Sequence, residues 1–101
     1  MNKTQWPRMA KRPLFTLGLV VATPGALAAL EKTGQPVEEF IDRHITGDWG
    51  DVTDEDKESN DSSARKGYRV LSAYHLQDGT KIWVITEADR SATTLLLPSE
   101  Y

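Results

Sequence analysis

The feature that most constrains this chain is the dipeptide Asp78-Gly79, which separates two stretches of alternating apolar and polar residues, 68–77 and 80–88. An Asp-Gly pair in this position is a strong signal for a β-hairpin with a two-residue turn. Such a turn places Tyr74 opposite Trp83 and His75 beside Ile82. The sequence therefore predicts an antiparallel strand pair in the C-terminal third of the chain.

The two faces of this hairpin are expected to differ. One face would be aliphatic and would pack against helices, with Leu71, Ala73, Ile82 and Val84. The other would be more aromatic, with Tyr68, Val70, Tyr74, Leu76, Trp83 and Ile85. A half-solvated sheet alternates apolar with polar residues, and the aromatic face does so poorly. We expect the N-terminal segment, a helix or a partner to cover it.

Residues 14–30 carry no charged side chain and allow two interpretations. In the first, 14–22 is a buried strand, and Thr23 caps a helix that starts at Pro24 and ends at Gly34. In this interpretation the protein is cytoplasmic, with a basic flexible tail over 1–13 and a single domain over 14–101.

In the second interpretation the same stretch is the apolar part of a secretory signal. Basic residues precede it, and Ala26-Leu27-Ala28 has the small-x-small form of a cleavage site. The mature chain would then begin near Ala29 and be secreted. The apolar run is too short to span a membrane in either case.

Two further helices and a last strand complete the expected fold. One helix covers 36–45, with Val37, Phe40, Ile41 and His44 spaced for one face. Another begins after Thr53, with Asp56 placed as in a capping box, and ends at Gly67. A strand over 93–97 follows. We predict an α+β domain with a small antiparallel sheet of about four strands and about three helices, packed on one face.

Composition limits the range of functions. A chain of 101 residues has room for one core, and the lack of cysteine excludes disulfides and thiolate chemistry. The net charge is −3, but residues 31–61 hold eleven acidic against three basic side chains. We therefore expect no direct nucleic-acid binding, and an electrostatic function would use this acidic segment.

The acidic segment contains the candidate partner-binding residues, which are Asp48, Trp49, Asp51, Asp54, Glu55 and Glu58. Such a surface could imitate a row of phosphates and bind the basic groove of another protein. The alternative is that the charges only solvate a polar helix. Trp49 would either fix its turn to the core or act as an exposed anchor.

A second polar cluster follows the hairpin and consists of Glu87, Asp89, Arg90 and Ser91. Glu87 could act as a base and Arg90 could hold an anion, as in a small hydrolase or transferase. The alternative is a turn closed by an Asp89 cap and an Arg90 ion pair.

Known catalytic and cofactor motifs are missing from the sequence: it has no phosphate loop, no Gly-x-Ser-x-Gly and no dinucleotide fingerprint. His44 with Asp48 and Asp51 is a weak metal candidate, and His44 is better explained as a cation at a helix C-terminus. We expect no enzyme activity, no cofactor and no bound metal.

Three segments, 21–27, 43–51 and 72–101, carry a resemblance to known sequences. With the motifs GDWGD and ITEADRSATTLLLP, the chain resembles a family of small bacterial proteins encoded on plasmids, phages and integrative elements, labelled plasmid-related proteins. The resemblance covers roughly residues 14–101. It implies that the Thr-Pro-Gly-Ala segment lies inside the domain, which favours the folded interpretation. It implies no catalytic residues.

The expected function is that of an accessory protein of mobile elements that binds another macromolecule, and we expect this partner to be a protein. Its acidic surface could counter a host defence or DNA-processing protein. The oligomeric state is left open.

Overall fold

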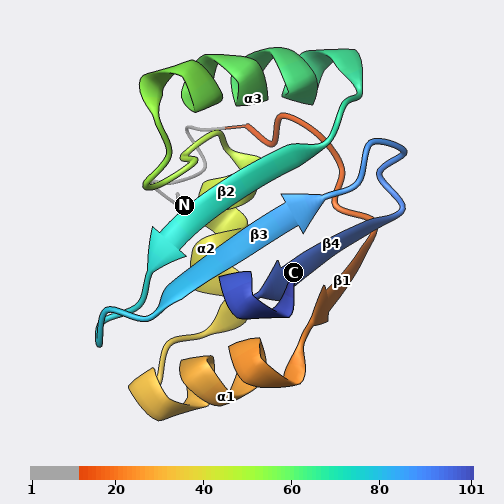
Figure 1. Ribbon diagram of the computed structural model, residues 1–101. Helices are drawn as coiled ribbons and strands as arrows, with labels where there is room; N and C mark the ends of the chain where they lie inside the picture. Colours follow the sequence, from red (N-terminus) through yellow and green to blue (C-terminus); the bar gives the residue numbers. More distant parts are fainter. Residues whose placement is uncertain (1–11) are drawn as a thin grey trace, which may run out of the picture.

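The computed structural model describes residues 12–101, so the basic tail falls outside it except for its last two residues. The sheet consists of β1 (Leu19–Ala22), β2 (Val70–His75), β3 (Lys81–Thr86) and β4 (Ala92–Leu96). The helices are α1 (Pro24–Thr33), α2 (Val37–Ile45) and α3 (Asp54–Lys66), followed at the end by the 3-10 helix η2 (Pro98–Glu100). The predicted α+β class is confirmed (Figure 1).

The sheet has the strand order β1-β4-β3-β2 and is mixed. β2 pairs with β3 and β3 pairs with β4 in antiparallel fashion, whereas β1 pairs with β4 in parallel. The prediction of a purely antiparallel sheet was wrong in this respect. Hairpin loops force antiparallel neighbours, but β1 and β4 are separated by all three α-helices and two strands, so no short turn links them.

The hairpin between β2 and β3 is confirmed, but its register differs by one residue from the predicted one. Leu76 donates its N–H to the Thr80 carbonyl, so the loop has three residues, and Gly79 closes it at φ 89°. A type I turn followed by a left-handed glycine produces this geometry. Tyr74 therefore pairs with Ile82 and not with Trp83.

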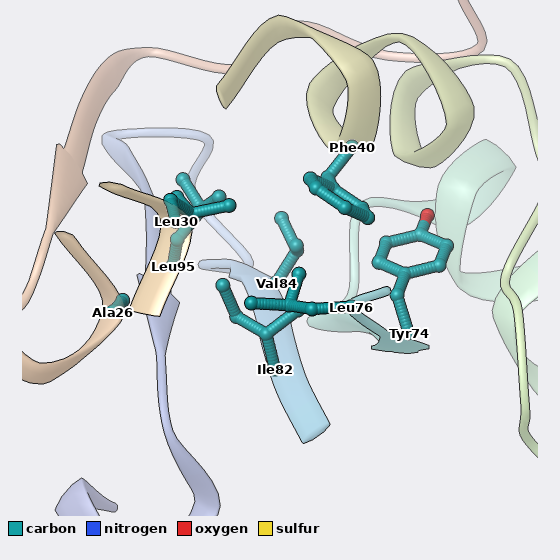
Figure 2. Packing of buried hydrophobic residues seen from close by; sticks show 8 residues of the cluster. All are labelled: Ala26, Leu30, Phe40, Tyr74, Leu76, Ile82, Val84 and Leu95. Atoms are coloured by element: carbon teal, nitrogen blue, oxygen red, sulfur yellow. The ribbon is translucent and has the colours of Figure 1, made fainter. Parts of the chain in front are cut away.

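When the register shifts by one residue, the side chains of one strand move to the opposite face relative to those of the other strand. Tyr74, Leu76, Ile82 and Val84 point to the same side and form the main core, with Leu95 of β4. Figure 2 shows Ala26 and Leu30 of α1 and Phe40 of α2 packed on this side. The helices thus cover the face that carries Tyr74, and Ala26 is fully buried there.

The opposite face carries Trp83, Ile85 and Leu96. η2 folds back over this face in front of β3 and β4, and Tyr101 meets the Trp83 ring edge-on at a centroid distance of 5.6 Å (Figure 1). Ile85 and Leu96 are buried there. The predicted aromatic face was wrong, because Tyr74 and Leu76 lie on the helix side, and the C-terminal residues cover the face that carries Trp83 and Ile85.

The three helices begin and end close to the predicted positions. The Thr23 and Thr53 hydroxyls accept hydrogen bonds from the backbone N–H groups of Ala26 and Asp56, and Gly34 and Gly67 end α1 and α3 in the left-handed conformation. These are local signals that a sequence displays directly.

The predicted buried strand over 14–22 is shorter and more exposed. Only Leu19–Ala22 forms β1, and Leu19 is 68% exposed. Gly18 has φ 65°, and a Cβ there would lie 2.3 Å from the Arg90 carbonyl oxygen, so the strand cannot extend back through it. Before Gly18 the chain crosses α2, where Leu14 donates to the Ile45 carbonyl.

Candidate functional site

Helix α3 presents nearly all of its side chains to solvent. Only Asn60 and Ala64 are buried, so Asp54, Glu55 and Glu58 point outward. Acidic residues in the first turn suit the positive end of the helix dipole, and Arg65 and Lys66 in the last turn suit the other end. The helix is therefore stable with an acidic surface at its N-terminal half.

Asn60 fixes α3 to the sheet. Its side-chain amide donates to the Leu71 carbonyl at 2.8 Å and accepts from the Leu71 N–H at 3.3 Å. One amide therefore satisfies both outward backbone groups of Leu71, as a neighbouring strand would. No sequence pattern indicates this contact, because a lone asparagine in a polar helix is usually solvated.

A pocket of about 170 Å³ lies between α3 and β2. It is lined by Val52, Asp56, Ser59, Asn60 and Leu71. Val52 and Leu71 are half-buried aliphatic side chains, and Asp56 adds an exposed carboxylate. The combination suits a side chain with an apolar stem and a cationic end, such as lysine or arginine.

The turn before α3 contains the other candidate acids, and the structure separates their roles. Asp48 forms a bidentate ion pair with Arg43, at 2.7 and 3.3 Å. Asp51 is exposed and accepts from Nδ1 of His75 at 2.5 Å. His75 therefore ends β2 at the surface, and the expectation that it packs beside Ile82 was wrong.

Trp49 does not belong to an exposed surface. It is only 3% exposed and donates from Nε1 to the Asp61 carboxylate at 2.9 Å. Its ring packs with Ala64, Val70 and Phe15, because it lies between the sheet and α3. Its inclusion among the partner-contacting residues was wrong, and the interpretation as a plug of the turn is confirmed.

Gly50 brings this turn against β2. The N–H of Ala73 donates to the Trp49 carbonyl, and the Ala73 carbonyl accepts from the Asp51 N–H. A Cβ at Gly50 would lie 2.0 Å from the Ala73 carbonyl oxygen, so only glycine permits the approach. Asp51 and the start of α3 are thereby held beside the edge of the sheet.

The second cluster, Glu87 to Ser91, is the turn between β3 and β4. The Arg90 guanidinium donates to the carbonyls of Ser63, Tyr68 and Glu87 at 2.8–3.0 Å and lies over the Phe15 ring. It thus closes the C-terminal end of α3, and the expected ion pair is replaced by hydrogen bonds to backbone carbonyls.

The acids of this turn also have structural partners. Asp89 accepts from the Ser91 side chain and N–H, which lowers the pKa of its carboxyl group. Glu87 lies 3.8 Å from Arg69. The four residues are adjacent, but their contacts are those of a closed turn.

His44 is the centre of a buried polar network that sequence reasoning missed. Its Nδ1 lies 2.6 Å from the Ser72 hydroxyl, and its Nε2 lies 2.9 Å from the Thr86 hydroxyl. Thr86 in turn contacts Thr93 at 2.7 Å. Burial, with a smaller effect from the positive charge of Arg90, lowers the pKa of His44 to about 3.

Two interpretations of His44 are excluded by this geometry. The ring is neutral at pH 7, so it is not a cation at the end of α2. Both ring nitrogens are engaged, so it cannot join Asp48 and Asp51 around a metal. Among residues 12–101 there is no group of three side chains suited to hold a metal ion.

No protein family, no curated protein and no solved structure matches this chain. No helix within the described residues is long and apolar enough to cross a membrane.

Proposed function

We propose that this chain is a small cytoplasmic accessory protein that binds a basic surface of another protein through the N-terminal half of α3. The proposed contact surface, called the α3 surface below, consists of Asp51, Asp54, Glu55, Asp56 and Glu58. The resemblance to proteins of mobile elements suggests that the partner is a host defence or DNA-processing protein.

The observation that carries the proposal is the pocket that Asp56 lines near the start of α3. A lysine or arginine of a partner could lay its aliphatic stem against Val52 and Leu71 and bring its charge to Asp56. Within residues 12–101, the ion pairs involve the acids Asp48, Asp51 and Glu87. Asp54, Glu55 and Glu58 therefore form no ion pair with a lysine, arginine or histidine of this part of the chain. An anchor pocket with surrounding like charge favours fast, specific association with a basic partner.

The alternative, a hydrolase or transferase that uses Glu87, Asp89, Arg90 and Ser91, has no comparable support. A substrate anion would need the Arg90 guanidinium, but that group is held by carbonyls of α3 and of the following loop. We therefore propose the α3 surface, and not this turn, as the functional site.

The first test uses a short oligolysine peptide as a defined basic probe. We expect saturable NMR shift changes in the ¹⁵N-labelled protein at Val52, Ser59 and Leu71. The double variant Glu55→Gln/Glu58→Gln should weaken binding by roughly tenfold, whereas Glu31→Gln/Glu38→Gln, which removes the same charge from exposed sites on α1 and α2, should not. Shifts spread evenly over all carboxylates, or equal loss in both variants, would contradict the proposal.

The second test uses the native host. The immobilised protein should retain a basic protein from nuclease-treated extract, and the Glu55→Gln/Glu58→Gln variant should not retain it. Added duplex DNA should compete for the captured protein, because both ligands would use the same basic surface. Retention that is unaffected by DNA and by the substitutions would contradict an acidic, phosphate-like contact.

A further inference from the structure

The sheet has two outer edges, and residues 12–101 cover only one of them. At the β2 edge, Asn60 bonds both backbone groups of Leu71, while Trp49 and Asp51 bond those of Ala73. Natural sheets commonly block an edge in this way to prevent pairing with other chains. The β2 edge is therefore closed from Leu71 to Ala73.

The β1 edge is different. Leu19 donates inward to the Ser91 carbonyl and Thr23 donates inward to the Leu95 carbonyl. Backbone groups alternate in direction along a strand, so those of Val20 and Ala22 face outward. Between residues 12 and 101, no strand pairs with this outer side. It is an unused set of donors and acceptors.

The side chains of β1 do not protect it. Leu19 is 68% exposed, and Val20 and Val21 are each 40% exposed. Edge strands are usually protected from pairing by a charged residue, a proline or a bulge. Residues 14–22 contain no charged residue and no proline. Figure 1 shows α1 running from the end of β1 back toward the side of β3 and β2, so it leaves the outer side of β1 uncovered.

We propose that β1 pairs with β1 of a second copy of this chain, antiparallel and about a two-fold axis at Val21. Val20 then lies opposite Ala22 of the second copy, with their outward N–H and C=O groups exchanged, and the two Val21 residues face each other. The two sheets become one continuous sheet.

The closed state of the β2 edge is what selects a second copy in this arrangement. Head-to-tail pairing of β1 with β2 would build an open filament, but Asn60 and the Trp49 turn occupy β2. The β1 edge can therefore pair only with the β1 edge of a second copy, and the assembly is a dimer. The absence of charge in β1 also means that self-pairing brings no like charges together. This inference does not depend on the proposed function, because the α3 surface lies at the other edge.

The test is the molar mass in solution by sedimentation equilibrium. We expect the wild-type chain to approach twice its mass of 11.3 kDa as the concentration rises from about 10 µM to about 1 mM. Val21→Lys and Val21→Glu should each stay monomeric, because like charges then meet at the axis. An equimolar mixture of the two should restore the dimer.

The control is Tyr68→Lys, which places the same charge at a side chain that is 60% exposed and precedes β2. It should dimerise as the wild type does. The mixture also guards against a folding defect, since misfolded variants would not recover when combined. A wild-type chain that stays monomeric throughout, or a Val21→Lys variant that dimerises as well as the wild type, would overturn the proposal.

Discussion

His44 joins α2 to three strands through hydroxyl groups. It contacts Ser72 of β2 and Thr86 of β3, and Thr86 extends the network to Thr93 of β4. Thr93 also donates to the Leu17 carbonyl, which ties the segment before β1 to the same network. Buried polar groups stabilise a unique arrangement only when each has a partner, as these do.

The buried His44 ring makes the stability of the fold depend on pH. The pKa of His44 is about 3 in the folded state and 6.5 when unperturbed. Below pH 6.5 the unfolded chain therefore binds a proton that the folded chain does not, and stability falls as the pH falls. Between about pH 7 and about pH 5 the free energy of unfolding should drop by about 2 kcal/mol on this account.

Urea unfolding at both pH values measures this drop. His44→Gln keeps a neutral polar side chain and should lose most of the pH dependence, although it will be less stable at pH 7. Asp78, Asp89 and Glu100 also have lowered pKa values, but these groups act at more acidic pH. An equal slope in the variant would contradict the assignment to His44.

Arg90 supports the second prediction at this scale. It adopts φ 60° and holds carbonyls of Ser63, Tyr68 and Glu87. Arg90→Ala should lower the free energy of unfolding by about 2–3 kcal/mol, because these carbonyls lose a charged donor. Arg90→Lys should recover little of it, since an ammonium cannot fork to several carbonyls. Thermal unfolding measures both, and a lysine variant as stable as the wild type would contradict this role.

At the scale of the elements, the local signals were reliable and the long-range ones were not. The caps at Thr23 and Gly34 fix α1, and those at Thr53 and Gly67 fix α3, because each depends on a few neighbouring residues. The hairpin turn was also visible, but Asp78-Gly79 fits a two-residue and a three-residue loop equally well. The choice of loop decides which face carries Tyr74, and it depends on the whole core.

The candidate site shows the same limit. The acidic character of α3 could be predicted from composition, whereas the pocket beside Asp56 and the burial of Trp49 depend on how α3 meets β2. The contacts responsible, Asn60 with Leu71 and Gly50 against Ala73, join residues that no sequence pattern links.

Alanine substitutions at Gly34 and Gly50 should destabilise the fold to different extents. Gly34 and Gly50 both have positive φ, at 73° and 77°, but a Cβ at Gly34 meets nothing within 4 Å. Gly34→Ala should therefore cost only the left-handed conformation, about 1 kcal/mol. Gly50→Ala adds a clash with the Ala73 carbonyl and should cost at least about 3 kcal/mol. Urea unfolding compares the two, and equal losses would mean that the turn tolerates separation from β2.

At the scale of the whole molecule, the first and last described elements hold each other. β1 pairs with β4, and the Glu100 carboxylate accepts from the Thr23 hydroxyl and from the Gly25 N–H. These bonds, with that to the Leu97 N–H, lower the pKa of Glu100. The start of α1 is thus capped by the C-terminal residues.

This arrangement predicts the effect of truncation. A chain that begins at Ala29 lacks β1, the buried Ala26, and Thr23 and Gly25, which bond Glu100 at the start of α1. We expect it to be unfolded by circular dichroism, whereas a chain that begins at Arg12 should retain the native spectrum and a cooperative melt. A cooperatively folded chain from Ala29 would contradict the structural role of residues 14–28 and would favour the secretory interpretation.

The pairing of β1 with β4 also orders events during synthesis. β1 leaves the ribosome early, but the strand beside it, Ala92–Leu96, is translated after every other strand and α-helix. Until β4 is translated, the backbone of Leu19, Val20 and Val21 has no neighbouring strand to pair with. Contacts between residues so far apart in sequence form slowly. We therefore expect this protein to complete its fold only after β4 has been translated.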